Sequence, residues 1–473
     1  MATPVESPPH TQPGVPPREP DAYRVSFERL EKLAKDPSWV RSARQAAFAR
    51  FRALGFPTLH DEDWRFTNVA PIGKLPFRPV FELAQDGLTA ESLSRFAFAG
   101  LKGSLLVFIN GHFAPGLSSI PAQTEGGRVS SLREALVRDP TLVEPHLFRG
   151  ADDDANAFTA LNTAFFLDGA FIFAPAGKTV PDPVHLVFVA TGKESGTTSH
   201  PRNLIVAERG SRLTVIESYV SLTDAACLTN TVTELVVGDH AGVEHLKFQD
   251  EGGPSFHVGH LAARFGRSSK VISHSFALGA RRSRTGIHAH LAGPDLECVL
   301  NGLYLTKGEQ LADHHMVVEH AQARGASHEY FNGILADKAK GVFHGRILVR
   351  PGAQKTDAKQ TNRNLLLSDD ATVDTKPQLE IYADDVKCTH GATVGQLDEE
   401  SIFYLRSRGL DLDNARRMLI HAFAGEILDR IRHEATREEL DKLVWDRLEQ
   451  HPLVAGQLPA HPKPEPATLN LRS

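Results

Sequence analysis

The stretch that decides the fold is Ala383-Asp-Asp-Val-Lys-Cys-Thr-His-Gly-Ala-Thr-Val-Gly395, where a long β-rich region gives way to a helical tail. In it, Cys388 and His390 alternate with Lys387 and Thr389. If these residues form a strand, the thiol and the imidazole point to the same face, with their Cα atoms about 6.6 Å apart. These two groups suit zinc or iron, but a closed zinc site needs about four ligands, so the others must come from elsewhere. The alternative is that Cys388 is a small buried apolar residue and His390 bonds to a turn carbonyl.

The region before this stretch, from about residue 184 to 395, is a succession of short runs rich in β-branched residues. Glycine-containing turns separate the runs at intervals of roughly 25–30 residues, the length of one coil of a parallel β-helix. We therefore expect a β solenoid whose two ends are covered by helical regions. An antiparallel sandwich is the alternative, because sequence does not distinguish pairing within a coil from hairpin pairing. The expected strands are 185–190, 203–207, 213–219, 232–237, 243–248, 271–276, 298–305, 342–349 and 379–382.

Helical patterns flank this region on both sides. Apolar residues recur at helical spacing from 24 to 54, broken by Asp36-Pro37, which predicts a helix–turn–helix pair. An acidic turn with Trp64 and Phe66 follows, and we expect these two rings to anchor the core. Residues 70–150 mix short strands, notably 104–109, with a helix near 131–137.

Three helices are predicted after Gly395. Asp398 can cap a helix that ends at Gly409, and Asp411 or Asp413 can begin the next. Residues 436–439 resemble a capping box for the third helix. The second helix carries an apolar stripe, which could dock on the rest of this chain or on a partner: Ala415, Met418, Leu419, Ala422, Phe423 and Ile427.

The composition is that of an ordinary globular protein. Among 473 residues, 41% are hydrophobic and 23% charged, and the net charge of −6 gives no basic surplus for nucleic acid. Three distant cysteines argue against a disulfide framework and for a reducing compartment, so we expect a cytoplasmic protein. No stretch reaches the roughly 18 apolar residues of a membrane helix. We divide the chain into a disordered tail (1–20), a mainly helical region (21–150), a β-helix core (151–397), a helical region (398–451) and a second disordered tail (452–473).

Few catalytic motifs are present. Gly352-Ala-Gln-Lys-Thr356 is only a fragment of a phosphate-binding loop, so this chain is not expected to bind or hydrolyse a nucleotide. The chain has 23 histidines, and His288 and His290 with Glu297 resemble the His-x-His…Glu of cupin metal sites. A cupin-like metal-dependent enzyme is therefore the alternative function, although the second cupin motif is not in its expected form. A secreted polysaccharide lyase is disfavoured because no groove of paired carboxylates is apparent.

Two longer stretches resemble a known family. Residues 391–409 with Ala415-Arg-Arg-Met-Leu-Ile420, and the earlier Asp61-Glu-Asp-Trp-Arg-Phe-Thr-Asn68, closely resemble the SufB/SufD family of iron–sulfur cluster assembly proteins. The resemblance spans most of the chain and is densest over 376–425. The low cysteine content of the chain places it nearer the SufD branch of this family. The resemblance implies a right-handed parallel β-helix, which favours the solenoid over the sandwich.

The same resemblance implies a non-catalytic scaffold subunit. Such a subunit pairs with a SufB paralogue through the β-helix ends and docks a SufC ATPase on its C-terminal helices, here about 398–451 and including Asp398, Arg416, Met418 and Phe423. The residue that matches the family's interface histidine is His390, beside which the nascent iron–sulfur cluster is expected to form. Cys388 ranks below it as a ligand. A homodimer in isolation is also compatible with this family, whereas nucleic acid and membranes are not expected as partners.

Overall fold

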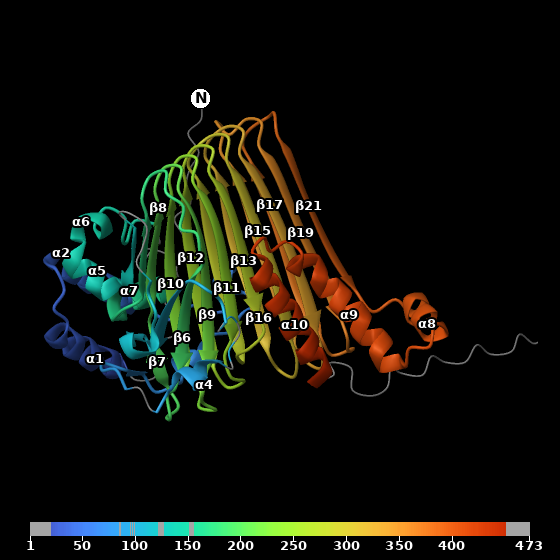
Figure 1. Ribbon diagram of the computed structural model, residues 1–473, viewed down its shortest axis with the longest axis horizontal. Helices are drawn as coiled ribbons and strands as arrows, with labels where there is room; N and C mark the ends of the chain where they lie inside the picture. Colours follow the sequence, from blue (N-terminus) through green and yellow to red (C-terminus); the bar gives the residue numbers. More distant parts are fainter. Residues whose placement is uncertain are drawn as a thin grey trace, which may run out of the picture.

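The computed structural model describes residues 20–450, except 85, 86, 95, 97, 99, 122–126 and 151–155. The predicted disordered tails, 1–20 and 452–473, lie outside the described residues apart from Pro20. The described chain is a parallel β-helix with helices at its N-terminal end and along one side (Figure 1). The prediction of a mainly β fold with helical ends is confirmed.

Two sheets face each other across the solenoid. Among the described residues, one sheet has eleven strands in the order β20-β18-β16-β14-β12-β10-β8-β5-β4, with β1 and β7 beside it. Its strands are β1 (Arg78–Pro79), β4 (Arg128–Ser131), β5 (Ala170–Ala174), β7 (Thr197–Ser199), β8 (Arg202–Ala207), β10 (Leu228–Val237), β12 (Phe256–Phe265), β14 (Arg282–Leu291), β16 (Leu311–His320), β18 (Lys340–Val349) and β20 (Thr372–Ile381).

The second sheet has ten strands among the described residues, in the order β21-β19-β17-β15-β13-β11-β9-β6-β2-β3. They are β2 (Ser104–Ile109), β3 (His112–Phe113), β6 (Val184–Ala190), β9 (Arg212–Ser221), β11 (Gly242–Asp250), β13 (Lys270–Ala277), β15 (Glu297–Thr306), β17 (Ala326–Leu335), β19 (Asp357–Leu366) and β21 (Lys387–Gly395). Every described pairing between two strands from β5 to β21 is parallel, which excludes the antiparallel sandwich. The antiparallel pairs β2–β3 and β4–β5 each include a strand of the N-terminal region.

Successive coils keep a nearly constant length. Leu311 pairs with Lys340, 29 positions later, and Asp357 pairs with Lys387, 30 positions later. Each coil therefore gives one strand to each sheet, and alternate residues point into the solenoid. The interior core includes Val215, Leu261, Ile287, Met316 and Phe343, all at most 6% exposed.

One corner of the solenoid repeats the same backbone conformation. Gly210 there has φ 71°, and five residues with side chains adopt φ between 53° and 63° at the equivalent place in later coils: His240, Ser268, Asp295, Arg324 and Lys355. The amide of each donates to a carbonyl of the next coil, for example His240 N to Arg267 O at 2.8 Å. This ladder satisfies the turn amides and fixes the coil-to-coil spacing.

The N-terminal region covers the first coils. Its helices are α1 (Pro20–Leu33), α2 (Ser38–Leu54), η1 (Glu62–Trp64), α3 (Ala70–Gly73), α4 (Ala90–Ser94), η2 (Pro115–Leu117), α5 (Leu132–Arg138), α6 (Pro140–Val143) and α7 (Ala157–Phe165). Tyr23, Phe27, Phe51 and Phe158 form an aromatic core with Phe256 of β12. Strands β1–β4 also belong to this region, and β2 and β4 each join a sheet.

Three helices follow the last strand: α8 (Glu399–Ser407), α9 (Leu412–Leu428) and α10 (Glu434–Gln450). Helices α9 and α10 lie along the outer face of the ten-stranded sheet, where Ile420 and Val444 pack with Phe248 and Leu303. Helix α8 lies beyond α9, at the opposite end of the molecule from the N-terminal helices (Figure 1).

Candidate functional site

The last coil of the solenoid is the candidate site. Strands β20 and β21 are the last members of their sheets, and no described strand pairs with their outer edges. Large apolar side chains are exposed here, with Ile381 at 40%, Tyr382 at 59% and Val394 at 48%. We call this coil, residues 372–395, the open end. Unpaired edges beside exposed apolar groups favour pairing with another chain.

His390 lies on the inward face of β21. It pairs in register with Gln360 of β19, which is only 1% exposed, and residues in register on neighbouring strands point the same way. No described coil covers β21, so the His390 side chain is exposed. The imidazole therefore lies on the inward face of the last coil, where no described coil covers it.

Cys388 shares this face but differs in its surroundings. It pairs with Ala358 and packs against the small apolar cluster formed by Ile347, Val349 and Ala383. Burial, assisted by the Asp357 carboxylate, raises the pKa of the Cys388 thiol. The raised pKa lowers the fraction of thiolate, which is the form of cysteine that binds metal. Cys227 and Cys298 are buried elsewhere in the solenoid.

The four residues predicted to bind a partner have different surroundings in the structure. Asp398 caps α8, where its Oδ2 accepts the Ser401 amide at 3.0 Å. Arg416 is 8% exposed and lies on the buried face of α9, whereas Met418 is 41% exposed. The Phe423 carbonyl accepts Asn332 Nδ2 at 2.9 Å, so this residue holds α9 on β17.

The predicted apolar stripe of α9 is wrong in part. The buried face of α9 runs through Ala415, Arg416, Ile420, Ala424 and Ile427, so Met418 lies outside it. The predicted start at Asp411 is confirmed by its cap on Asn414 N at 2.8 Å.

The predicted capping box at 436–439 is also wrong. Helix α10 begins at Glu434, so Thr436 lies inside its first turn, and its hydroxyl lies 2.7 Å from His433 Nδ1. The side chain of His433 therefore replaces the expected threonine cap.

Sequence reasoning missed two aromatic residues on α8. Phe403 is 74% exposed and Tyr404 57% exposed, and only Ile402 of this helix is buried. Together with Leu419 they line a surface depression whose rim carries Glu399 and Glu400. The sequence does carry a signal for these exposed rings. The run 402–405 is hydrophobic at all four positions, whereas a helix that buries a single residue needs far fewer apolar side chains.

Comparison with known proteins identifies the family of this chain. Residues 188–423 match the family described as "SUF system FeS cluster assembly, SufBD core domain", and residues 21–186 match the "SufBD protein N-terminal region". The chain belongs to the SufB/SufD family. A SufBD family iron–sulfur cluster assembly protein of Synechocystis sp. is 34% identical over 84% of this chain and 88% of that protein. The iron–sulfur cluster assembly protein SufD of Escherichia coli is 33% identical over 83% and 90%, and SufD of Bacillus subtilis is 27% identical over 89% and 96%.

The Asp61–Asn68 stretch docks on the solenoid. Trp64 is 9% exposed, as predicted for a core anchor, and the Arg284 guanidinium lies 3.9 Å from its ring centroid. Arg284 Nη2 also donates to the Asp63 carbonyl at 2.8 Å, and Thr67 Oγ1 donates to Asp313 Oδ2 at 2.5 Å. This stretch therefore attaches the N-terminal region to β14 and β16.

The cupin-like alternative is wrong for this SufB/SufD-family chain. Glu297 lies on β15 in the other sheet, where its carboxylate is 3.3 Å from Lys270 Nζ. His290 instead lies 3.1 Å from Glu319 Oε2, and His288 lies 3.9 Å from the same oxygen. The parallel solenoid also differs from the antiparallel barrel of cupins.

No described helix is long and apolar enough to cross a membrane.

Proposed function

We propose that this chain is a SufD-type scaffold subunit of a SufBCD complex that assembles iron–sulfur clusters. Membership of the SufB/SufD family supports a role in iron–sulfur cluster assembly. The open end supports the role of a scaffold subunit that pairs with another chain. The nascent cluster is the cargo of this complex. The chain contributes His390 and an interface, and it catalyses no reaction alone.

Pairing with a SufB paralogue follows from the unpaired edges of β20 and β21. A second solenoid whose open end faces this one would add strands to both edges and satisfy their backbone groups. It would also cover Ile381, Tyr382 and Val394, which are exposed in this chain. Two copies of this chain would use the same edges, so a homodimer is expected when the paralogue is absent.

His390 supports a cluster site shared between two chains. One imidazole supplies a single ligand, and the Cys388 thiol beside it is held in its protonated form by its raised pKa. A cluster bound here would need further thiolate ligands, which the paralogue would supply across the interface. The inward face of β21 brings the imidazole to the centre of that interface.

Docking of a SufC ATPase is supported by α8. Its exposed Phe403 and Tyr404 beside Glu399 and Glu400 form a mixed apolar and acidic surface. Aromatic residues on an exposed helix are typical anchors of a protein interface. A partner with a basic rim around an apolar groove would complement it. Nucleotide would then be bound by that partner, and the complex would work in the cytoplasm.

Co-purification tests this function. The tagged chain would be expressed alone and together with the products of its neighbouring genes, and bound proteins, iron and sulfide would be measured. We expect a colourless chain alone, and a complex with an ATPase and a second β-helix protein when they are co-expressed. Isolation of the chain without either partner under co-expression would refute the scaffold function.

A further inference from the structure

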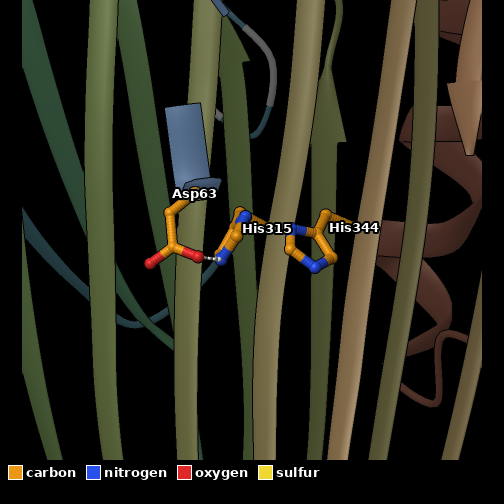
Figure 2. A group of neighbouring side chains, drawn as sticks. All are labelled: Asp63, His315 and His344. Carbon is orange, nitrogen blue, oxygen red and sulfur yellow. Dashed lines mark ion pairs between the residues drawn. The ribbon is translucent and has the colours of Figure 1, made fainter. Parts of the chain in front are cut away.

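A histidine and carboxylate cluster lies on the outer face of the eleven-stranded sheet, beside the first strand of the open end. His315 of β16 and His344 of β18 lie in register on neighbouring strands, and the carboxylate of Asp63 in η1 points toward His315 (Figure 2). Each residue offers one ligand atom, and these three atoms lie within 4.8 Å of one another. We propose that Asp63, His315 and His344 bind a divalent first-row transition metal ion, Fe²⁺ or Zn²⁺.

The ligand set fits such an ion. Two imidazoles and one carboxylate bind Fe²⁺ in non-haem iron sites and Zn²⁺ in many zinc sites, and both leave further positions for water. His315 Nε2 lies 3.5 Å from Asp63 Oδ1, and the rings of His315 and His344 are 4.2 Å apart between centroids. An ion between these groups would need only small side-chain movements to reach bonds of about 2.0–2.2 Å.

The hydrogen bonding of His344 leaves one nitrogen ready to bind. Its Nε2 lies 2.6 Å from Gln378 Oε1, and an amide oxygen can only accept, so Nε2 carries the proton. Nδ1 of the neutral ring then holds the free electron pair. Metal-binding histidines are commonly oriented by such a second hydrogen bond. Burial lowers the pKa of the His344 imidazole.

His315 is nearly buried without the partners that a buried imidazole needs. The residue is 9% exposed, and its Nδ1 has no hydrogen bond within the described residues. Its Nε2 faces the Asp63 carboxylate without an ideal hydrogen bond, at 3.5 Å. Burial and the Arg284 charge hold the pKa of His315 well below its usual range. A metal ion bound at Nε2 would replace this long contact with a direct bond, while Nδ1 would keep its present surroundings.

Each of the surrounding cations is paired with a carboxylate, which weakens its repulsion of an ion at this site. Arg284 pairs with Asp313, Lys376 Nζ lies 2.8 Å from Glu62 Oε1, and Arg346 Nη1 lies 3.6 Å from Glu380 Oε1. The Asp63 side chain is 64% exposed, which gives an ion access from solvent. A bound ion would link the N-terminal stretch to β16 and β18.

Metal titration of the purified full-length chain tests the proposal. Metal-free protein would be titrated with Zn²⁺ by calorimetry, and with Fe²⁺ by anaerobic equilibrium dialysis. The test variants are Asp63→Asn and His344→Gln. The control is the double variant His288→Gln, His290→Gln, which removes two histidines from the same outer face.

We expect a site of about one ion per chain whose affinity falls at least about tenfold in both test variants and stays unchanged in the control. Zn²⁺ should also raise the Tm of the wild type and of the control but not that of Asp63→Asn. This variant alters only an exposed carboxylate, so its folding is not in question. Unchanged affinity of both ions in Asp63→Asn and His344→Gln would overturn the proposal, as would loss of binding in the His288, His290 variant.

Discussion

His390 of β21 lies in register with Gln360 of β19, one coil away, on the same inward face of the solenoid. Gln360 is 1% exposed and donates from Nε2 to Glu329 Oε2 at 2.6 Å. His390 is exposed. The two positions have equivalent backbones, and they differ because β21 covers Gln360 whereas no described strand covers His390.

Replacement of His390 by alanine should impair cluster assembly and leave the scaffold intact. The side chain is exposed, so its loss should change the free energy of unfolding by no more than about 0.5 kcal/mol. Thr389→Ala is the matched control, because Thr389 is the exposed neighbour on the opposite face of β21. Iron and sulfide bound to the co-expressed complex would be measured. Normal cluster content in the His390→Ala complex would remove this residue from the site.

Glu329 should make stability fall as pH rises. Burial raises the pKa of its carboxyl from 4.5 to about 7. The unfolded chain therefore loses this proton near pH 4.5, while the folded chain keeps it until about pH 7. Between these values the folded state binds more protons, so the free energy of unfolding declines by about 3 kcal/mol in total and is level above pH 7.

Glu329→Gln removes this titration and retains an oxygen for the Gln360 amide. Denaturation of the variant and the wild type would be followed from pH 4.5 to 8.5. The variant should gain stability relative to the wild type as pH rises. A difference between the two proteins that is constant with pH would show that Glu329 is ionised in the folded state throughout.

Polar substitution on α8 should weaken ATPase docking. Phe403→Ser with Tyr404→Ser removes two exposed rings, and loss of interface anchors of this kind costs about 2 kcal/mol or more of binding free energy. Val137→Ser, which alters an apolar residue 73% exposed in the N-terminal region, is the control. Kd values from a binding titration would be compared. Equal Kd values for the wild type, the Phe403, Tyr404 double variant and Val137→Ser would place the docking surface elsewhere.

The buried ion pair between Arg202 and Glu234 should be essential to the first coils. Glu234 Oε1 lies 2.6 Å from Arg202 Nη2, and its carboxylate also accepts the amides of Phe148, Arg149 and Gly150. Glu234→Gln leaves the Arg202 charge buried and unpaired, which costs about 3–5 kcal/mol.

An exposed pair provides the comparison for this prediction. Glu297 lies 3.3 Å from Lys270, with both side chains at least 41% exposed, and Glu297→Gln should cost about 1 kcal/mol or less. Urea denaturation monitored by circular dichroism would measure both. Similar losses for the two variants would contradict the assigned role of burial.

The sequence predicted the strands that are rich in β-branched residues and missed those that are polar. The run 342–349 corresponds to β18, Lys340–Val349, whereas β19, Asp357–Leu366, was not predicted. Its inward residues Gln360, Asn362 and Asn364 are buried because their amides bond inside the solenoid, for example Asn364 Nδ2 to Asn362 Oδ1 at 2.7 Å. Hydrophobic alternation gives no signal for a buried polar face.

For the site, local sequence was sufficient where the determining contacts were local. The alternation around Cys388 and His390 gave their common face, and the Asp398 cap follows from a bond to Ser401, three residues away. The tertiary structure alone decided which positions of the last coil stay uncovered and that Asp63 meets His315 and His344. The physical reason is that period and capping depend on neighbours along the chain, whereas burial and the Asp63 cluster depend on contacts between coils and segments hundreds of residues apart.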